Sequence, residues 1–176
     1  ILAWVNLPSY NPNLFSTGIS HKIWTELLNH PFKPLRNKVI QDHFSPGSTF
    51  KPFVAIAALQ EKIIRPGTLV YSPSKIKFGR RFYHDHSRSG YGNISVIEAL
   101  ERSSNVFFYK MGIALGIDRI ASYSKYLGLG AQTGVQIPNE VSGLIPTEEW
   151  KEKAYGEPWQ PGENLSNAIG QGFILT

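Results

Sequence analysis

A serine and a lysine spaced three residues apart carry the first chemistry that the sequence suggests. Ser48 follows a Pro-Gly turn, and the apolar stretch 48–60 that it opens is expected to form a helix. Side chains at positions i and i+3 share one helical face, so Lys51 is expected to lie beside Ser48. A serine hydroxyl is a weak nucleophile until a base removes its proton, and a desolvated lysine amine can be that base. The pattern therefore predicts Ser48 as a nucleophile and Lys51 as its general base.

The position of Ser48 at a helix start adds to this hypothesis. The first N–H groups of a helix lack partners within it, and its positive end favours negative charge, so an alkoxide or tetrahedral oxyanion would be stabilised there. The alternative for so short a pattern is a serine N-cap followed by a surface lysine. The pattern alone leaves both interpretations open.

A second polar motif, Ser103-Ser104-Asn105, interrupts the helical pattern of residues 95–115. Its side chains can therefore leave the helix face. The Ser103 hydroxyl could pass a proton between the lysine and a leaving group, and the Asn105 amide could orient Lys51 or a substrate carbonyl. Ordinary capping of the second helical run by Ser and Asn is the alternative.

The elements that must position these residues are mostly helices. We expect one helix to begin after Ser20 and to end before Pro31. Its apolar side chains Trp24, Leu27 and Leu28 repeat at helical spacing and predict one buried stripe. The other expected elements are a strand over 1–7, short strands and turns over 66–93, helices over 48–60, 95–102, 106–115, 118–127 and from 148 onward, and a loop over 156–172.

Composition bounds the class of protein. The chain has 176 residues, of which 41% are hydrophobic and 18% charged, and its net charge is +5. These values exclude a disordered polar chain, and the longest apolar runs are too short to span a membrane. The absence of cysteine excludes a disulfide scaffold, a cysteine nucleophile and a thiolate zinc site.

Basic residues lie among aromatic ones between residues 75 and 91. Such a mixture can contact a nucleic-acid strand, another anionic polymer or a membrane surface. A solvated loop or β-ribbon explains the same residues without a partner, and we predict no nucleic-acid partner.

The two polar motifs match the first two of a set of three, S-x-x-K, S-D-N and K-T-G, found in penicillin-binding proteins and class A β-lactamases. Further segments in register with them resemble the class B penicillin-binding proteins, and among these the penicillin-binding protein 2 subfamily. The matching segments are residues 6–15, 18–20, 46–52, 103–109, 111–112, 116–119, 146–151 and 170–172. Their order and approximate spacing hold over nearly the whole chain.

The resemblance implies a role for each residue of the two motifs. Ser48 would be the acyl-enzyme nucleophile and Lys51 its general base. Ser103 would relay a proton, Asn105 would orient Lys51 or the substrate, and Ser104 would contribute to substrate binding. The resemblance implies no cofactor.

The resemblance also implies a mixed α+β fold of the β-lactamase/transpeptidase type, with a sheet flanked by helices and an all-helical subdomain. Residues 1–176 are expected to be the central, helix-rich part of one transpeptidase domain, without the N-terminal anchor and pedestal or the strand of the third motif. No Lys-Thr-Gly or Lys-Ser-Gly occurs in the sequence. The similar 88–90 segment, Arg-Ser-Gly, lies between the first two motifs, whereas the family places its third motif after both. We therefore exclude this segment as the third motif.

Some relatives carry a zinc site before the second motif, built from Asp, His and Cys. Asp85 matches an aspartate of that site, but Tyr91 stands where a histidine is expected and the sequence has no cysteine. His84 and His86 flank Asp85 and could hold an adventitious cation. A stable site needs three or four convergent ligands, so we predict a polar loop without a metal.

The activity implied is that of a peptidoglycan D,D-transpeptidase of cell elongation, which cross-links stem peptides through a serine acyl-enzyme at D-Ala-D-Ala and is the target of β-lactams. The implied partners are a SEDS-type glycosyltransferase and the elongation machinery, at the periplasmic face of the bacterial inner membrane. The alternatives are a class D-like serine β-lactamase, a β-lactam sensor domain, and a non-enzymatic assembly scaffold.

Overall fold

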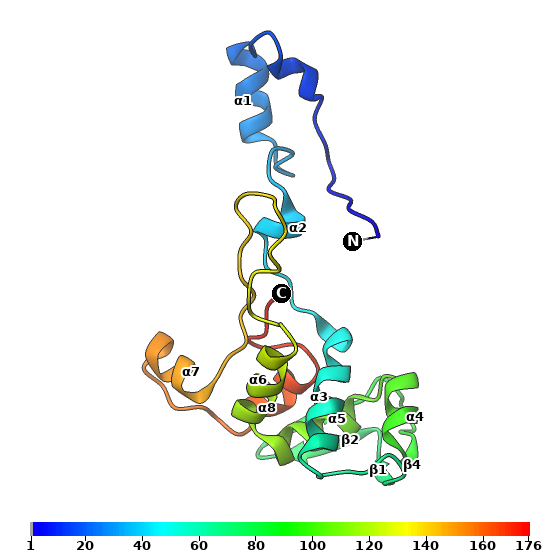
Figure 1. The fold of residues 1–176 in the computed structure, drawn as a ribbon. Coiled ribbons are helices and arrows are strands. Elements are labelled where there is room, and N and C mark those ends of the chain that lie inside the picture. The colour runs from blue at the N-terminus through cyan, green and yellow to red at the C-terminus, as the bar shows by residue number, and fades with distance from the viewer. Residues whose placement is uncertain (1) are drawn as a thin grey trace. The chain divides into compact units, whose positions relative to one another are not determined.

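A computed structural model describes residues 2–176, which form two compact units. The smaller unit combines Ile1–His43 with Gly134–Val141, and the larger combines Phe44–Thr133 with Ser142–Thr176. All residues of the two predicted motifs lie in the larger unit. Figure 1 shows the ribbon of both units, with labels on the α-helices and on strands β1, β2 and β4.

The smaller unit contains a 3₁₀ turn, η1 (Pro12–Phe15), and two helices, α1 (His21–Asn29) and α2 (Lys38–Gln41). Helix α1 begins as predicted, because the Ser20 hydroxyl accepts a hydrogen bond from the N–H of Ile23 at 3.4 Å. The predicted buried stripe is wrong, because Trp24 is 38% exposed and Leu28 is 54% exposed.

The predicted strand over residues 1–7 is also wrong over its described part, residues 2–7. Apolar alternation forms a strand only where a neighbouring strand offers backbone partners. Here Val5 and Leu7 are each 70% exposed, and the polar side chain of Asn6 makes the contacts instead. Its amide donates to the carbonyl of Arg36 at 3.0 Å and accepts from the N–H of Lys38 at 3.1 Å.

The core of the larger unit is built on two apolar helices, α3 (Lys51–Gln60) and α5 (Asn105–Leu115). Helix α3 continues a 3₁₀ turn, η2 (Gly47–Phe50), so the predicted helix over 48–60 is confirmed with a tighter first turn. Helix α5 is apolar on all sides and packs against α3, α6 (Ile117–Tyr126) and α8 (Glu163–Ala168). Such a helix is stable only as a buried element.

Helix α4 (Val96–Glu101) ends before the second motif, and α5 begins within it. The predicted break in the helical run at Ser103–Asn105 is therefore confirmed. Helices α6 and α7 (Glu148–Tyr155) follow the predicted ranges, and Thr147 caps α7 by accepting from the N–H of Trp150 at 3.0 Å. Helix α8, in contrast, lies where a loop was predicted. It is six residues long, and its buried members include two asparagines, so it carries no strong helical pattern.

The strands are short and form two antiparallel pairs. Strand β1 (Val70–Ser72) pairs with β4 (Gly92–Ile94), and β2 (Lys75–Phe78) pairs with β3 (Arg81–His84). The prediction of short strands and turns over 66–93 is confirmed. The structure is thus a mixed helix and strand fold, dominated by helices.

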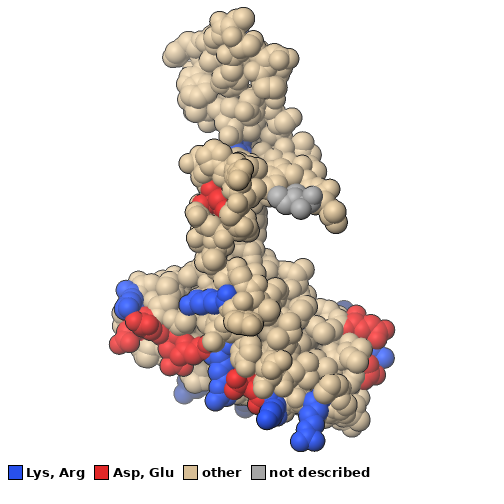
Figure 2. All heavy atoms as spheres, viewed as in Figure 1, with Lys and Arg blue, Asp and Glu red and all other residues tan. Residues whose placement is uncertain are grey.

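Charged side chains of both signs are interspersed on the face of the larger unit that Figure 2 shows. The basic residues of β2 and β3 lie near aromatic rings, as in the stacking of Lys75 on Phe82 with the amine 4.9 Å from the ring centroid. No helix formed by residues 2–176 is long and apolar enough to cross a membrane.

Candidate active site

Ser48 lies in the tight turn at the start of the central helix. Gly47 has φ of +57°, a left-handed conformation that glycine adopts without strain, and its N–H donates to the carbonyl of Gly170 at 2.8 Å. The Thr49 hydroxyl donates to the carbonyl of Pro46 at 2.8 Å and closes the turn. Ser48 itself is exposed, and its hydroxyl forms no hydrogen bond with any side chain in the described part of the chain.

Gly170 supports this turn through its lack of a side chain. A Cβ atom there would meet the carbonyl oxygen of Gly47 at 2.1 Å and the Cβ of Phe50 at 2.7 Å. The segment 170–172 matched relatives by sequence, but its role was not predicted from the residues. A glycine that follows Ala168 and Ile169 gives no sign in the sequence of the distant backbone that it must approach.

Lys51 is buried, with 1% of its surface exposed, and all three of its N–H donors point at oxygen atoms of the second motif. Its amine lies 2.6 Å from the carbonyl oxygen of Ser103, 3.0 Å from the Ser103 hydroxyl and 2.8 Å from the side-chain oxygen of Asn105. The ring of Phe108 lies beneath it, with the centroid 5.7 Å from the amine. The structure therefore brings together Lys51, Ser103 and Asn105, which are distant in the sequence.

The burial of Lys51 changes its acid–base chemistry. Desolvation lowers the pKa of the amine from 10.5 to about 8, and the negative charge of Asp85 opposes this shift. At pH 7 roughly one molecule in ten then carries the neutral amine, which is the form that can accept a proton. An exposed lysine would be almost fully protonated at this pH.

Ser103 has an unusual backbone conformation, with φ of +52°. Left-handed geometry in a residue other than glycine costs free energy and persists where the surrounding structure imposes it. The conformation directs both the carbonyl and the hydroxyl of Ser103 toward Lys51. The sequence predicted a break in the helix here but not this geometry.

Ser104 has a different environment from the substrate-binding position that the sequence suggested. It is completely buried, and its hydroxyl caps α5 by accepting from the N–H of Phe107 at 3.3 Å. The same hydroxyl donates to a carboxylate oxygen of Asp85 at 2.8 Å and contacts the Ser72 hydroxyl at 2.7 Å. Ser104 thus presents no surface to a substrate and acts in the scaffold of the second motif.

The sequence did not predict that Asp85 belongs to the candidate site. The sequence suggested it only as a metal position, whereas its side chain is fully buried and accepts hydrogen bonds from Ser104, Val106 and His86. The signal available in the sequence was weak, because a single aspartate in a basic and aromatic loop suggests a surface residue.

The residues around Asp85 do not fit a zinc site. Both carboxylate oxygens are engaged by protein donors, and the Tyr91 hydroxyl lies 2.7 Å from a ring nitrogen of His86. Within residues 2–176 no three His, Cys, Asp or Glu side chains gather in a way that could hold a metal ion. The local chemistry is that of a hydrogen-bond network.

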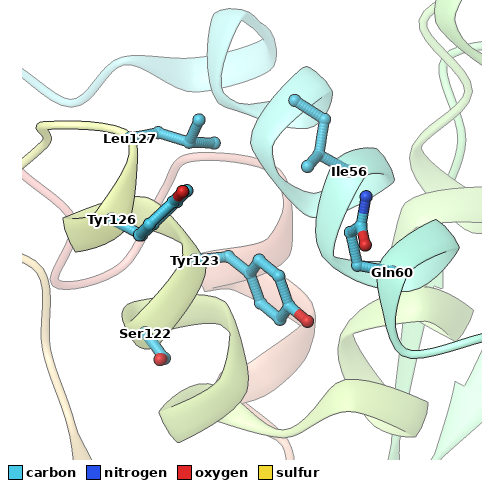
Figure 3. Close-up of a pocket in the computed structure, with 6 residues that line it drawn as sticks. All are labelled: Ile56, Gln60, Ser122, Tyr123, Tyr126 and Leu127. Carbon is cyan, nitrogen blue, oxygen red and sulfur yellow. The ribbon is translucent and has the colours of Figure 1, made fainter.

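A separate cavity of about 550 Å³ lies between α3 and α6. Figure 3 shows that Ile56 and Gln60 of α3 face Tyr123 and Tyr126 of α6 across it. None of the motif residues lines this cavity, so it is not the candidate active site.

Comparisons with known proteins show the family to which the chain belongs. A family model described as the penicillin binding protein transpeptidase domain matches residues 1–174. The peptidoglycan D,D-transpeptidase MrdA of Escherichia coli strain K12 is 39% identical over 175 residues, which are 98% of this chain and 28% of MrdA. The chain therefore spans about 28% of the length of this relative.

Two solved structures are similar in fold and sequence. Pseudomonas aeruginosa PBP2, in complex with WCK 5153, has a TM-score of 0.93 and 38% identity over 98% of this chain and 38% of that one. Helicobacter pylori PBP2, in complex with MreC, has a TM-score of 0.93 and 34% identity over 97% of this chain and 32% of that one. These matches confirm the predicted resemblance to penicillin-binding protein 2 and the predicted fold class.

Proposed function

Because the chain belongs to the penicillin-binding protein transpeptidase domain family, we propose that it carries the nucleophile and base of a peptidoglycan D,D-transpeptidase. The observation that supports this most directly is the buried amine of Lys51, held by Ser103 and Asn105 one helical turn from the exposed Ser48. A lysine that is buried and has a lowered pKa is suited to remove a proton from a serine.

The reaction begins with the neutral amine of Lys51 taking the Ser48 proton. The serine oxygen attacks the carbonyl carbon of the penultimate D-Ala of a stem peptide, and the tetrahedral oxyanion forms at the positive N-terminal end of the helix, which favours negative charge. The C–N bond then breaks, the terminal D-Ala amine takes a proton, and Ser48 is left as an ester. An amine from a neighbouring stem peptide attacks this ester and releases Ser48.

Ser103 and Asn105 have distinct parts in this scheme. The Ser103 hydroxyl, 3.0 Å from the lysine amine, passes the proton from Lys51 to the leaving D-Ala amine. The Asn105 side-chain oxygen, 2.8 Å from the same amine, accepts a hydrogen bond from it and fixes its position. Neither residue changes charge, so both work throughout the catalytic cycle.

The relatives indicate where the reaction is used. MrdA is named a peptidoglycan D,D-transpeptidase, and the Helicobacter pylori PBP2 was solved with MreC. We place this protein correspondingly in cell elongation, with stem peptides as substrates, β-lactams as inhibitors, and an elongation complex that includes a SEDS-type glycosyltransferase as partner. Its site of action would be the periplasmic face of the inner membrane.

Labelling of the full-length protein with a fluorescent penicillin tests the proposal. Wild-type protein should become labelled covalently, and Ser48→Ala should remove the label because it removes the attacking oxygen. Ser45→Ala is the matched control, since it deletes an exposed hydroxyl three positions earlier and should label normally. Labelling that survives Ser48→Ala would refute the assigned nucleophile.

Nitrocefin distinguishes the transpeptidase from a serine β-lactamase, because the latter must deacylate quickly. We expect a burst in which one nitrocefin ring is opened per protein as Ser48 is acylated, followed by slow turnover limited by deacylation. Rapid multiple turnovers would exclude the transpeptidase proposal, and wild-type protein that is folded but never labelled would indicate a scaffold.

A further inference from the structure

The carboxylate of Asp85 lies under the second motif and binds it directly. One oxygen accepts from the Ser104 hydroxyl at 2.8 Å and from the N–H of Val106 at 2.9 Å. The other oxygen accepts from the N–H of His86 at 2.8 Å and lies 3.1 Å from Nδ1 of its ring. The side chain of Asp85 is completely buried, so these contacts replace its hydration.

His86 and Tyr91 extend the same network to the other side of the motif. Nε2 of His86 lies 3.0 Å from the carbonyl oxygen of Arg102, and the Tyr91 hydroxyl lies 2.7 Å from the same ring nitrogen. The Tyr91 hydroxyl also donates to the carbonyl of Arg102 at 3.4 Å. The guanidinium of Arg102 lies over the Tyr91 ring, 5.7 Å from its centroid.

The network therefore holds the turn at both ends, at Arg102 before Ser103 and at Val106 after Asn105. The two residues Ser103 and Asn105, which lie between these contacts, bind the amine of Lys51. Ser103 is also the residue in the strained left-handed conformation, which needs such external contacts to persist.

We propose that Asp85 is a positioning residue that, with His86 and Tyr91, clamps the Arg102–Val106 turn and so holds Ser103 and Asn105 on the amine of Lys51. Hydrogen bonds and the stacking of Arg102 on Tyr91 hold this turn, and the residues around it do not fit a zinc site. This proposal rests on the proposed transpeptidase function, because the clamp matters for activity only if Lys51 acts as the base for Ser48.

The charge of Asp85 also reaches the lysine. The groups that face Lys51 are the neutral oxygens of Ser103 and Asn105 and the ring of Phe108, and Asp85 is the ionised side chain that acts on it. The charge of Asp85 favours the protonated amine and opposes the fall in the pKa of Lys51 that desolvation causes. Replacing this carboxylate with an amide should therefore lower the pKa of Lys51 further.

The titratable groups that face Asp85 itself are His86, Tyr91 and Tyr109, besides the more distant Lys51. Burial, and after it the charge of Asp85, raises the pKa of Tyr91 and of Tyr109. Both tyrosines are therefore harder to ionise than a free tyrosine, since their pKa values are raised.

The test compares Asp85→Asn with wild type in the full-length protein, using the rate constant of acylation by a fluorescent penicillin from pH 6 to pH 10. The amide places an N–H₂ group against donors, so at least one clamp contact is lost. We expect acylation to slow by roughly 10- to 100-fold, since a small displacement of a catalytic group has effects of this size. The midpoint of the rising limb should move to lower pH.

Ser72→Ala is the matched control. It removes a buried hydrogen bond from the Ser104 hydroxyl but leaves every contact of Asp85 in place, so it reports the cost of general loosening. We expect its acylation rate to stay within about threefold of wild type and its midpoint to be unchanged.

Three results would overturn the inference. The first is acylation of Asp85→Asn at the wild-type rate. The second is a midpoint that moves to higher pH, because a merely loosened site would admit water and return the pKa of Lys51 toward 10.5. The third is a loss of wild-type acylation on dialysis against EDTA that zinc restores, since a metal would then hold the turn. Failure of the transpeptidase proposal is distinguishable, because wild-type protein would then not be acylated through Ser48.

Discussion

At the scale of single residues, the proposed base is the amine of Lys51, and its protonation would determine when the site can react. Its three donors are occupied by oxygens of Ser103 and Asn105, so the ammonium form is satisfied and inert as a base. Loss of one proton frees an electron pair for Ser48. Burial makes this loss possible near neutral pH by lowering the pKa to about 8.

The first prediction follows from this pKa. The rate constant of acylation should rise with pH and reach half its maximum near pH 8, because the neutral form of Lys51 increases as pH passes the pKa of the amine. Lys51→Arg should remove the rising limb and slow acylation by about 100-fold or more, since a guanidinium stays protonated. Lys110→Arg, on the same α5 helix that carries Asn105, should leave the profile unchanged. A flat profile for wild type would contradict the prediction.

Asn105→Asp should shift the same profile in the opposite direction to Asp85→Asn. The new carboxylate would lie at the position of an oxygen now 2.8 Å from the amine of Lys51 and would favour the ammonium form. An opposite charge this close raises a lysine pKa by roughly 1–3 units, so the midpoint should move to higher pH. The acylation profile measures the shift, and Asn93→Asp in strand β4 is the control that should leave it in place. An unmoved midpoint in Asn105→Asp would show that Asn105 does not contact the base in solution.

Much of the residue-scale site could be predicted from the sequence, because S-x-x-K and S-x-N are short local patterns. The pairing of Lys51 with Ser103 and Asn105 was one of two open interpretations of the residues, and the family resemblance favoured it, since nothing local links positions so far apart. Asp85 escaped prediction for a related reason. Its importance lies in burial beneath another segment, which a single sequence does not display.

At the scale of elements, two glycines show how closely the helices and turns must approach. Gly170 lies against the turn that carries Ser48, and Gly112 of α5 lies against α8. In both places backbone or a small side chain occupies the space that a Cβ atom would need. Each site gives a sharp prediction.

Gly170→Ala should disturb the turn of Ser48. The new Cβ would lie 2.1 Å from the carbonyl oxygen of Gly47, and Gly170 also has φ of +70°. We expect acylation to fall by at least about tenfold and the free energy of unfolding to fall by about 1–3 kcal/mol beyond the backbone strain. Penicillin labelling and thermal unfolding measure the two effects.

Gly156→Ala is the control for Gly170→Ala, because it measures the effect of backbone strain without a steric clash. Gly156 has nearly the same φ, +68°, but beyond its own chain neighbours no atom lies within 4 Å of the position that a Cβ would take. Alanine there therefore meets strain without a clash. The free energy of unfolding of Gly156→Ala should fall by about 1–2 kcal/mol, and its acylation rate should stay at the wild-type value. Equal acylation by both variants would show that Gly170 does not shape the site.

Gly112→Ala should destabilise the protein, although the same change in an exposed helix stabilises it. The added Cβ would lie 2.6 Å from both the Cβ of Ala168 and the backbone oxygen of Asn164. We expect a loss of about 1–3 kcal/mol in thermal unfolding. Ala168→Gly in the same chain should restore part of it, because only one of the two clashes is relieved. An increase in stability would mean that α8 can move away from α5.

Helices with clear caps were predictable from sequence, and the other elements less so. Ser20 and Thr147 both accept the hydrogen bonds that their patterns predicted. Helix α8 has no side-chain cap, and its six residues are held by packing on α5. Glu163 of α8 also forms an ion pair with the buried Lys151 of α7 at 2.6 Å, and such a contact between two helices is not visible in the local sequence pattern.

At the scale of the whole molecule, the fold class followed from the register of motifs rather than from the strands. The two strand pairs alone would not identify a β-lactamase/transpeptidase fold. The division into two units was not predicted, because the smaller one joins segments from distant parts of the chain. Its segments meet through backbone contacts such as that from the N–H of Val141 to the carbonyl of Ile40 at 2.8 Å. Composition does not change at these boundaries.

The backbone contact between Gly47 and Gly170 has a consequence for biosynthesis. Nearby, Phe44 and Thr176 exchange two backbone hydrogen bonds, at 2.9 and 2.8 Å, so both partners of the nucleophile's turn come from residues 170–176, far along the sequence from Ser48. A ribosome makes Ser48 long before it makes either partner. Until residues 170–176 have been synthesised and have folded back, the turn of Ser48 has its local Thr49–Pro46 hydrogen bond but lacks these distant backbone partners. The complete set of backbone contacts around Ser48 therefore forms only after the whole of residues 44–176 is present.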